Sequence, residues 1–367
     1  MQGCETEGKN EWKRRYIGEM LYYSGIAHYI NNVLDVFKYK AERKDSFVIV
    51  LAARLSGKPH IGTLINFMIG FKLAQELYDT YKKDTVVKIE LLDNISDVAI
   101  SQVLDINSDV YFYKESVVSN ETLNENYQAF IDMIKRIKIL SNIGSEVYSY
   151  EQIQSMPEMR KSIVEVVRYQ DFFSKLFNPK HPQLHIRTAC PHCGLIEKNC
   201  KHTHISMMSN TTFKIDSACP IHGSFSELFA ADNNTYIDMN VPLRHFCKGY
   251  SLVKMDKENN SLSIQVLGND WSGIWPLRIF CEGILKVKGE ELPSFLFSPL
   301  IIDDNGKVSK SKINYTRCPK SFENVNLLTN VQLLSLWNEI SKWFNQSDLF
   351  FTNYKLDYLK EVTNINE

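Results

Sequence analysis

The sequence has no excess of charge of either sign. Its 42 lysines and arginines are balanced by 43 aspartates and glutamates among 367 residues, which gives a formal net charge of −1. Such a chain has no global positive field that would draw it to nucleic acid or to an anionic membrane. A local basic surface is not excluded by this balance.

Long apolar runs are also missing. Residues 1–15 contain no apolar signal core, and no segment approaches the roughly 18 apolar residues that a membrane helix needs. The sequence has no internal repeat and no low-complexity segment. We therefore expect a cytoplasmic protein with no membrane partner. Its length allows one large domain with an insertion, or two domains.

The eight cysteines are unevenly placed. Four of the eight cysteines lie between positions 190 and 219, and six of the nine histidines lie between positions 181 and 222. In a reducing compartment such clustering favours metal binding over disulfide bonds.

Two motifs in this region have the form of metal knuckles, C-P-x-[CH]-G. The glycine of each knuckle permits a tight turn whose N–H groups face the ligand sulfur. Four soft ligands on two knuckles predict a closed, structural Zn²⁺ site. The predicted ligands are Cys190, Cys193, Cys219 and His222. Cys200, His202 and His204 are alternative ligands or a second site, but they lack the knuckle form.

The first half of the chain has the pattern of a βαβ unit. Residues 47–53 form a continuous apolar run, as in a strand covered on both faces. A glycine-containing turn and a helical pattern over residues 64–78 follow, and residues 85–94 predict a second buried strand. We therefore predict an α/β fold with a Rossmann-like parallel sheet.

The remaining elements suggest how the chain is divided. Helices are predicted over residues 11–40, 121–140, 158–176 and 273–287, and strands over residues 262–267 and 294–303. The expected parts are an N-terminal helical segment (1–46), a first catalytic half (47–180), a zinc-binding insertion (181–229), a second catalytic half (230–325) and C-terminal helices (326–367).

Polar motifs follow the predicted strands. In "SGKPHIGT", backbone N–H groups and a helix N-terminus would bind phosphate, with His60 as a donor and Gly62 permitting close approach of a ribose or base. In "LGNDW", Asp270 can accept hydrogen bonds from both ribose hydroxyls, and Gly268 permits their approach. Taken alone, the first motif is more often a structural turn, and the second reads simply as a turn.

The stretch "IIDDNGKVSKSK" concentrates lysine and serine directly after a predicted strand. By itself such a run is typical of a solvated loop. Here it would lie at the same edge of the sheet as the two glycine-containing turns. We therefore expect a mobile loop at this edge of the sheet.

The whole arrangement resembles the catalytic domain of class I aminoacyl-tRNA synthetases, and among them most closely the class I lysyl-tRNA synthetases. "PHIGT" resembles their HIGH element, "KVSKS" their KMSKS loop and "GNDW" their GKDH-type turn, with a cysteine-rich insertion between. The resemblance covers residues 47–312. Thr63, Val308 and Trp271 depart from the family pattern, and the 55 residues after Lys312 are few for the family's anticodon-binding region.

The resemblance implies activation of an amino acid, lysine being favoured, by attack of its carboxylate on the α-phosphorus of ATP with Mg²⁺. His60, Lys307 and Lys310 would be the catalytic residues, because they bind the triphosphate and neutralise the leaving pyrophosphate. The implied ATP site comprises Ser56, Gly57, His60, Gly62, Thr63, Gly268, Asp270, Lys307, Ser309 and Lys310. No amino-acid-binding residues are predicted, although Glu90, Asp93 and Asp97 are acidic candidates that Arg54 opposes.

Three readings of the function stay open. Two differ in the molecule that accepts the activated amino acid, and the third is not an enzyme. The activated amino acid could pass to a tRNA recognised through its acceptor stem, which the zinc insertion favours. It could instead pass to a small molecule or carrier protein, which the near-neutral charge and short C-terminal part favour. A non-catalytic synthetase-like sensor is the third reading, and the retained His60, Lys307 and Lys310 argue against it.

Overall fold

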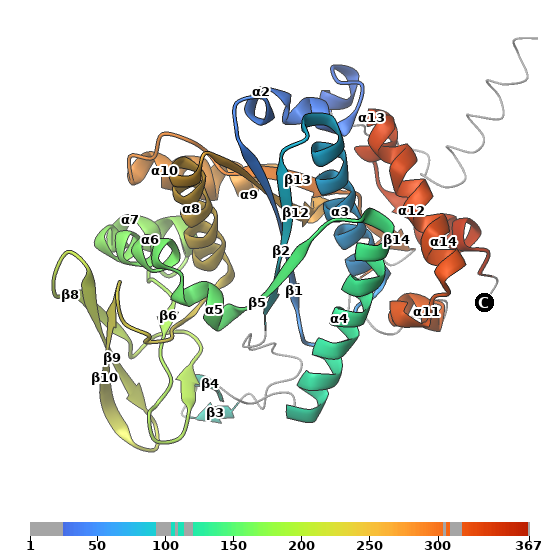
Figure 1. The fold of residues 1–367 in the computed structure, drawn as a ribbon. Coiled ribbons are helices and arrows are strands. Elements are labelled where there is room, and N and C mark those ends of the chain that lie inside the picture. Colours follow the sequence, from blue (N-terminus) through green and yellow to red (C-terminus); the bar gives the residue numbers. More distant parts are fainter. Residues whose placement is uncertain are drawn as a thin grey trace, which may run out of the picture.

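The computed structural model describes residues 25–92, 104–106, 109–113, 120–303, 306–308 and 318–365. Five parallel strands form the central sheet, and helices cover both of its faces (Figure 1). The strands are β1 (Ser46–Arg54), β2 (Asp84–Leu92), β5 (Ser145–Ser149), β12 (Ser261–Gly268) and β13 (Ser294–Ser298). The predicted α/β fold with a parallel, Rossmann-like sheet is confirmed.

The order of the strands determines where a ligand can bind. The sheet runs β13-β12-β1-β2-β5, and every neighbouring pair is parallel. The chain therefore builds outward from β1 in one direction, then returns and builds outward in the other. Such a reversal between β1 and β12 opens a crevice at the carboxyl ends of the strands, where doubly wound folds bind nucleotides.

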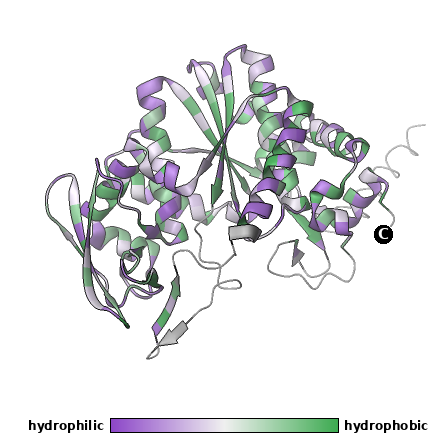
Figure 2. Cartoon of the chain, turned by 60° about the horizontal axis from the view of Figure 1, so that its bottom comes forward, coloured by the Kyte–Doolittle hydropathy of each residue, from purple (hydrophilic) through white to green (hydrophobic). Residues whose placement is uncertain are grey.

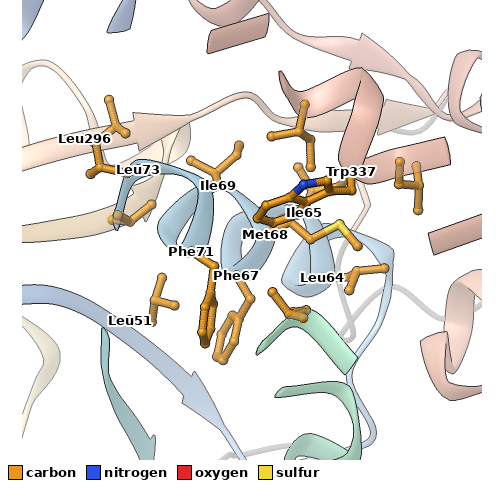
Figure 3. Close-up of a cluster of buried hydrophobic side chains, with 14 of the residues drawn as sticks. Leu51, Leu64, Ile65, Phe67, Met68, Ile69, Phe71, Leu73, Leu296 and Trp337 are labelled. Carbon is orange, nitrogen blue, oxygen red and sulfur yellow. The ribbon is translucent and has the colours of Figure 1, made fainter. Parts of the chain in front are cut away.

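One face of the sheet is covered by α3 (Ile61–Tyr81), α4 (Asn120–Ser141) and α12 (Asn330–Asn345). Figure 3 shows Leu51 of β1 facing Phe67 and Phe71 of α3, with Trp337 of α12 over the far side of that helix. A Cβ added at Gly70 would lie 2.7 Å from a methyl carbon of Leu51, so α3 packs closely on β1. This packing fixes the start of α3 at the carboxyl edge of the sheet.

The opposite face is covered by α8 (Val241–Asn259), and α6 (Pro157–Arg168), α7 (Gln170–Phe177) and the π-helical turn η4 (Leu277–Cys281) pack in the same hydrophobic cluster. In Figure 2 hydrophobic residues line the central strands, whereas hydrophilic residues gather on outward faces of the helices. The helix predicted over residues 158–176 is divided at Tyr169. The helix predicted over 273–287 is α9 (Ile274–Pro276), η4 and α10 (Glu282–Lys286) in succession.

The cysteine-rich region forms small antiparallel sheets at one side of the molecule (Figure 1). One sheet contains β8 (His204–Met207), β9 (Thr212–Cys219) and β10 (Gly223–Ala230); another joins β3 (Leu104–Ile106) and β4 (Asp109–Tyr113) to β7 (Leu195–Glu197). A two-stranded sheet pairs β6 (Ile186–Arg187) with β11 (Asp238–Met239). These sheets therefore include segments before and after residues 181–229.

The single strand predicted over residues 294–303 is wrong, because the chain changes sheet at Pro299. β13 ends at Ser298, and β14 (Ile301–Asp303) belongs to a separate small sheet. There it pairs with β15 (Gly306–Lys307) and with β16 (Tyr354–Lys355) from the C-terminal part. The strand that leads into the lysine loop (residues 301–312) therefore pairs with the C-terminal part of the chain.

The single N-terminal helix predicted over residues 11–40 is wrong in its described portion. Residues from Gly25 form three short turns: η1 (Gly25–His28), η2 (Val33–Val36) and α2 (Lys38–Ala41). Asn32 starts a new helix through a capping box with Asp35, which interrupts the longer one. Residues 1–24 lie outside the described part of the chain.

Short elements complete the structure: α5 (Tyr150–Ser155), η3 (Asn269–Trp271), α11 (Lys320–Glu323), η6 (Val325–Leu327), α13 (Ser347–Phe350) and α14 (Leu356–Thr363). Among the helices of the described residues, none has the length and apolar character to cross a bilayer.

Candidate functional site

His60 lies at the junction of β1 and α3. It is the N-cap of the 21-residue helix α3, and its Nδ1 accepts a hydrogen bond from the Gly62 backbone N–H at 3.1 Å. An accepting Nδ1 assigns the proton of the neutral ring to Nε2. The imidazole therefore offers an N–H donor beside a helix N-terminus, where the helix dipole favours an anion.

Gly62 is required for this arrangement. A Cβ at this position would lie 3.0 Å from Cε1 and 3.3 Å from Nδ1 of His60, so it would displace the ring. The same Cβ would lie 3.8 Å from the carbonyl oxygen of Val308, which places the turn beside the lysine loop. Thr63, Ser56 and Gly57 are half-buried in or next to the same turn.

Asp270 and Lys307 meet although they come from different segments. Lys307 Nζ lies 2.5 Å from Asp270 Oδ2, and the two side chains are 41% and 33% exposed. A Cβ at Gly268 would lie 2.5 Å from Asp270 Oδ1, so the absence of a side chain there makes room for the carboxylate. The predicted ribose group and the first lysine of the loop are thus brought together at the end of β12.

Val308 anchors the loop. Its side chain is 4% exposed within the main hydrophobic core, and its N–H donates to the Ile301 carbonyl at 2.9 Å. The valine that replaces the family's methionine therefore still provides an apolar anchor. Ser309 and Lys310 lie outside the described residues, and the roles of all the ATP-site residues stay predictions.

The four predicted metal ligands come together at the turn of the β9–β10 hairpin. Their ligand atoms all lie within 4.8 Å of one another. Cys193 Sγ is 3.6 Å from Cys219 Sγ, and His222 Nδ1 is 3.6 Å and 3.7 Å from the sulfurs of Cys219 and Cys190. A tetrahedral Zn²⁺ with Zn–S of about 2.3 Å and Zn–N of about 2.0–2.1 Å requires ligand separations of about 3.5–3.8 Å. The Cys3His cluster could therefore bind zinc.

Both knuckles turn through glycine. Gly194 and Gly223 have φ of +73° and +77°, a conformation that favours glycine. The cluster is accompanied by a small core of its own, with Tyr111 and Leu195 buried beside the cysteines. So small a core makes a metal the natural means of holding the region together.

The alternative ligands are outside this cluster. Cys200 is fully buried and its thiol hydrogen-bonds to the Ile186 carbonyl at 3.7 Å; burial raises its pKa to about 12. The imidazole of His202 lies 3.4 Å from a carboxylate oxygen of Glu197, and His204 is exposed at the start of β8. These positions therefore show no convergence with the four knuckle ligands.

Of the three acidic residues considered as ligands of the amino acid, the structure describes only Glu90. Glu90 is buried on β2, and its carboxylate lies 2.6 Å from Nζ of Lys248 on α8. Asp93 and Asp97 lie outside the described residues. Glu90 is thus engaged with a cation of the protein itself.

Sequence reasoning missed an aromatic cluster beside Asp270. The ring of His245, on α8, lies 5.1 Å from that of Trp271 and 5.8 Å from that of Trp275, and the two indoles are 4.9 Å apart. Burial, with nearby Lys248, Arg244 and Arg54, lowers the pKa of His245 well below its usual value. The sequence signal was the departure at Trp271, but nothing in it indicated His245.

No protein-family profile and no curated protein sequence matches this chain. Solved structures with a similar fold include a Leishmania major tyrosyl-tRNA synthetase in complex with fisetin, at 13% identity and a TM-score of 0.39. It covers 76% of this chain, which spans only 30% of that protein. Similarity at this level concerns the fold alone.

Two further solved structures are also aminoacyl-tRNA synthetases. A glutamate-tRNA synthetase from Elizabethkingia anophelis is 12% identical and covers 86% of this chain and 70% of its own, with a TM-score of 0.38. A tyrosyl-tRNA synthetase from Archaeoglobus fulgidus complexed with L-tyrosine is 11% identical and covers 92% and 96%, with a TM-score of 0.38. The similar structures named here are thus all aminoacyl-tRNA synthetases.

Proposed function

We propose that this protein activates an amino acid with ATP and transfers it to tRNA. In the first step, a carboxylate oxygen of the amino acid attacks the α-phosphorus of ATP. A new P–O bond forms to the amino acid as the bond to the bridging oxygen breaks, and pyrophosphate leaves with that electron pair. The products are an aminoacyl adenylate and pyrophosphate, and no protein nucleophile is needed.

The observation that carries the proposal is the convergence of three polar motifs at the switch point of the sheet. The His60 turn follows β1, Asp270 follows β12, and Lys307 reaches Asp270 from the loop after β14. Each group suits a different part of ATP: a helix N-terminus and Nε2–H for phosphate, a carboxylate for ribose hydroxyls, and a lysine for pyrophosphate. In ATP-using enzymes Mg²⁺ is commonly bound through the substrate phosphates, so Mg²⁺ is expected to accompany ATP.

Lys307 would act by binding charge that develops during the reaction. Pyrophosphate gains negative charge as the P–O bond breaks, so a cation held against it favours the transition state over bound ATP. The contact with Asp270 holds Lys307 at the edge of the crevice before ATP arrives. Lys310 is proposed to share this role.

The amino acid and the acceptor are the finer parts of the proposal. Lysine is the amino acid that the sequence resemblance names, and tRNA is the acceptor that the zinc-knuckle region supports. A ligase that transfers to a small molecule or carrier protein would need the same adenylation chemistry. The two acceptors therefore differ only in the second step.

ATP–pyrophosphate exchange across the twenty amino acids tests the first step, and charging of total tRNA tests the second. The proposal expects exchange with one amino acid and charging of one tRNA species with the same amino acid. Exchange without charging would reject tRNA and leave the ligase. No exchange under any condition would reject the enzymatic function.

A further inference from the structure

A group of polar side chains lies between α8 and the carboxyl half of the sheet, and the adenylation chemistry above does not use it. We call it the α8 polar layer. Its members are Glu90, His245, Lys248, Gln265 and Trp275. His245 and Trp275 both contact Trp271, the neighbour of Asp270, so the layer adjoins the proposed ATP site. Figure 1 shows α8 running beside β12 on this face of the sheet.

Gln265 projects into the layer from β12. Ile264 and Val266 belong to the core on the α3 side, whereas the hydroxyl of Ser263 donates to Asp256 of α8 at 2.7 Å. Because strand side chains alternate, Gln265 shares the α8 side with Ser263. Its side chain is 3% exposed, and its Nε2 has no hydrogen-bond partner among the described residues.

A second buried donor is on the segment that follows β12. The indole Nε1 of Trp275 is buried and also has no partner within the described part of the chain. His245 packs against both indoles, and its lowered pKa leaves the ring neutral, with one N–H, at pH 7. A buried N–H without an acceptor is unfavourable. Two N–H donors of the layer therefore have no acceptor among the described residues, and a ligand oxygen could satisfy them.

The charged side chains in and around the layer also favour a ligand oxygen over an ammonium group. Its carboxylate, Glu90, already pairs with Lys248 at 2.6 Å, and both side chains are nearly buried. The other charged groups that influence His245 are the cations Arg244 and Arg54. An entering ammonium would meet cations and a carboxylate that is already paired. A carboxylate or amide oxygen would meet N–H donors in a positive environment.

We propose that the α8 polar layer binds the side chain of the activated amino acid, and that this side chain ends in a carboxylate or an amide. The class comprises aspartate, asparagine, glutamate and glutamine. This assignment rests on the proposed amino-acid activation, and it replaces lysine, the amino acid named by resemblance.

Direct binding separates this inference from the proposed function. Isothermal titration of the full chain with L-aspartate, L-asparagine, L-glutamate, L-glutamine and L-lysine is expected to show binding of at least one of the first four, and at least ~10-fold weaker binding of lysine. Preferential binding of lysine, or no binding of any of the five, would overturn the inference. Binding without pyrophosphate exchange would reject adenylation while the inference about the subsite stands.

Variants locate the subsite. Trp275→Phe removes the N–H and keeps an aromatic ring, and Gln265→Leu removes the amide; each is expected to weaken amino-acid binding about 10-fold with ATP binding unchanged. Gln128→Leu, at an exposed position on α4, is the matched control. Unchanged amino-acid affinity in both Trp275→Phe and Gln265→Leu, with both variants folded, would overturn the assignment.

A change of specificity gives a further readout. Lys248→Met removes the partner of Glu90 and is expected to raise the affinity for lysine while lowering that for the acidic or amide ligand. No gain for lysine in a folded Lys248→Met variant would show that the Glu90–Lys248 pair does not exclude ammonium groups. Should Lys248→Met not fold, the Trp275→Phe measurement still decides.

Discussion

Replacing Lys307 with methionine should impair catalysis far more than stability. Lys307 Nζ lies 2.5 Å from Asp270 Oδ2, but the side chains are 41% and 33% exposed. An ion pair exposed to this degree contributes about 0.2–1 kcal/mol to folding. In a domain of this size a loss of about 1 kcal/mol lowers Tm by roughly 2–4 °C or less.

The expected catalytic loss is larger because the charge on pyrophosphate develops only during reaction. Removing one preorganised charge donor lowers the rate about 10²-fold or more, which corresponds to about 2.7 kcal/mol of transition-state stabilisation. The catalytic effect should therefore exceed the stability effect at least twofold in free energy. If Lys307 served only to stabilise the fold, the effect of Lys307→Met on stability would exceed its effect on catalysis.

The assay is pyrophosphate exchange at saturating ATP, measured beside thermal denaturation of the same preparations. Lys257→Met is the matched control, since Lys257 pairs with Glu290 at 2.8 Å on the surface, with side chains 70% and 75% exposed. The control should leave both exchange and Tm close to those of the parent. An exchange rate in Lys307→Met that equals the control's would refute the proposed role of the loop.

Three other predictions test the remaining parts of the site. Purified protein should contain about one zinc per chain by metal analysis; Cys219→Ser should lose it and Cys281→Ser, outside the cluster, should retain it. A chelator should then expose residues 181–229 to protease before the central sheet, and equal cleavage rates in both regions would argue against a structural metal. Lys310→Ala should lower exchange by at least ~10²-fold, and an unchanged rate would remove this lysine from the mechanism. Gly62→Ala should raise the KM for ATP at least ~10-fold, because the added Cβ would lie 3.0 Å from the His60 ring; an unaltered KM would mean that the ring position does not matter.

Local features of the fold were predictable because they depend on neighbouring residues. The run at β1 is apolar throughout, as a strand covered on both faces must be, and the helix after it has a regular apolar spacing. The zinc knuckles were also predictable, since two ligands three residues apart and a glycine form a unit whose geometry is local. The predicted helix over residues 11–40 and the predicted strand over residues 294–303 were wrong because one residue interrupts each. Asn32 begins a new helical turn, and Pro299 ends one strand before another begins.

Contacts across the sheet were not predictable in the same way. The pairing of Glu90 with Lys248 joins β2 to α8 across more than a hundred residues, and no pattern in either segment indicates the other. The same holds for His245, which becomes part of a site only because α8 places it against two indoles from the segment after β12.

By itself, the sequence determined the parallel α/β character, the metal knuckles and the polar motifs that follow the strands, because each is encoded within a short segment. Only the tertiary structure decided that β12 lies beside β1, which brings Asp270 and Lys307 to the edge where His60 begins α3. It also decided which charges are already paired and which donors are buried without a partner in the described residues. Those are properties of packing between distant segments, and the proposed choice of amino acid rests on them.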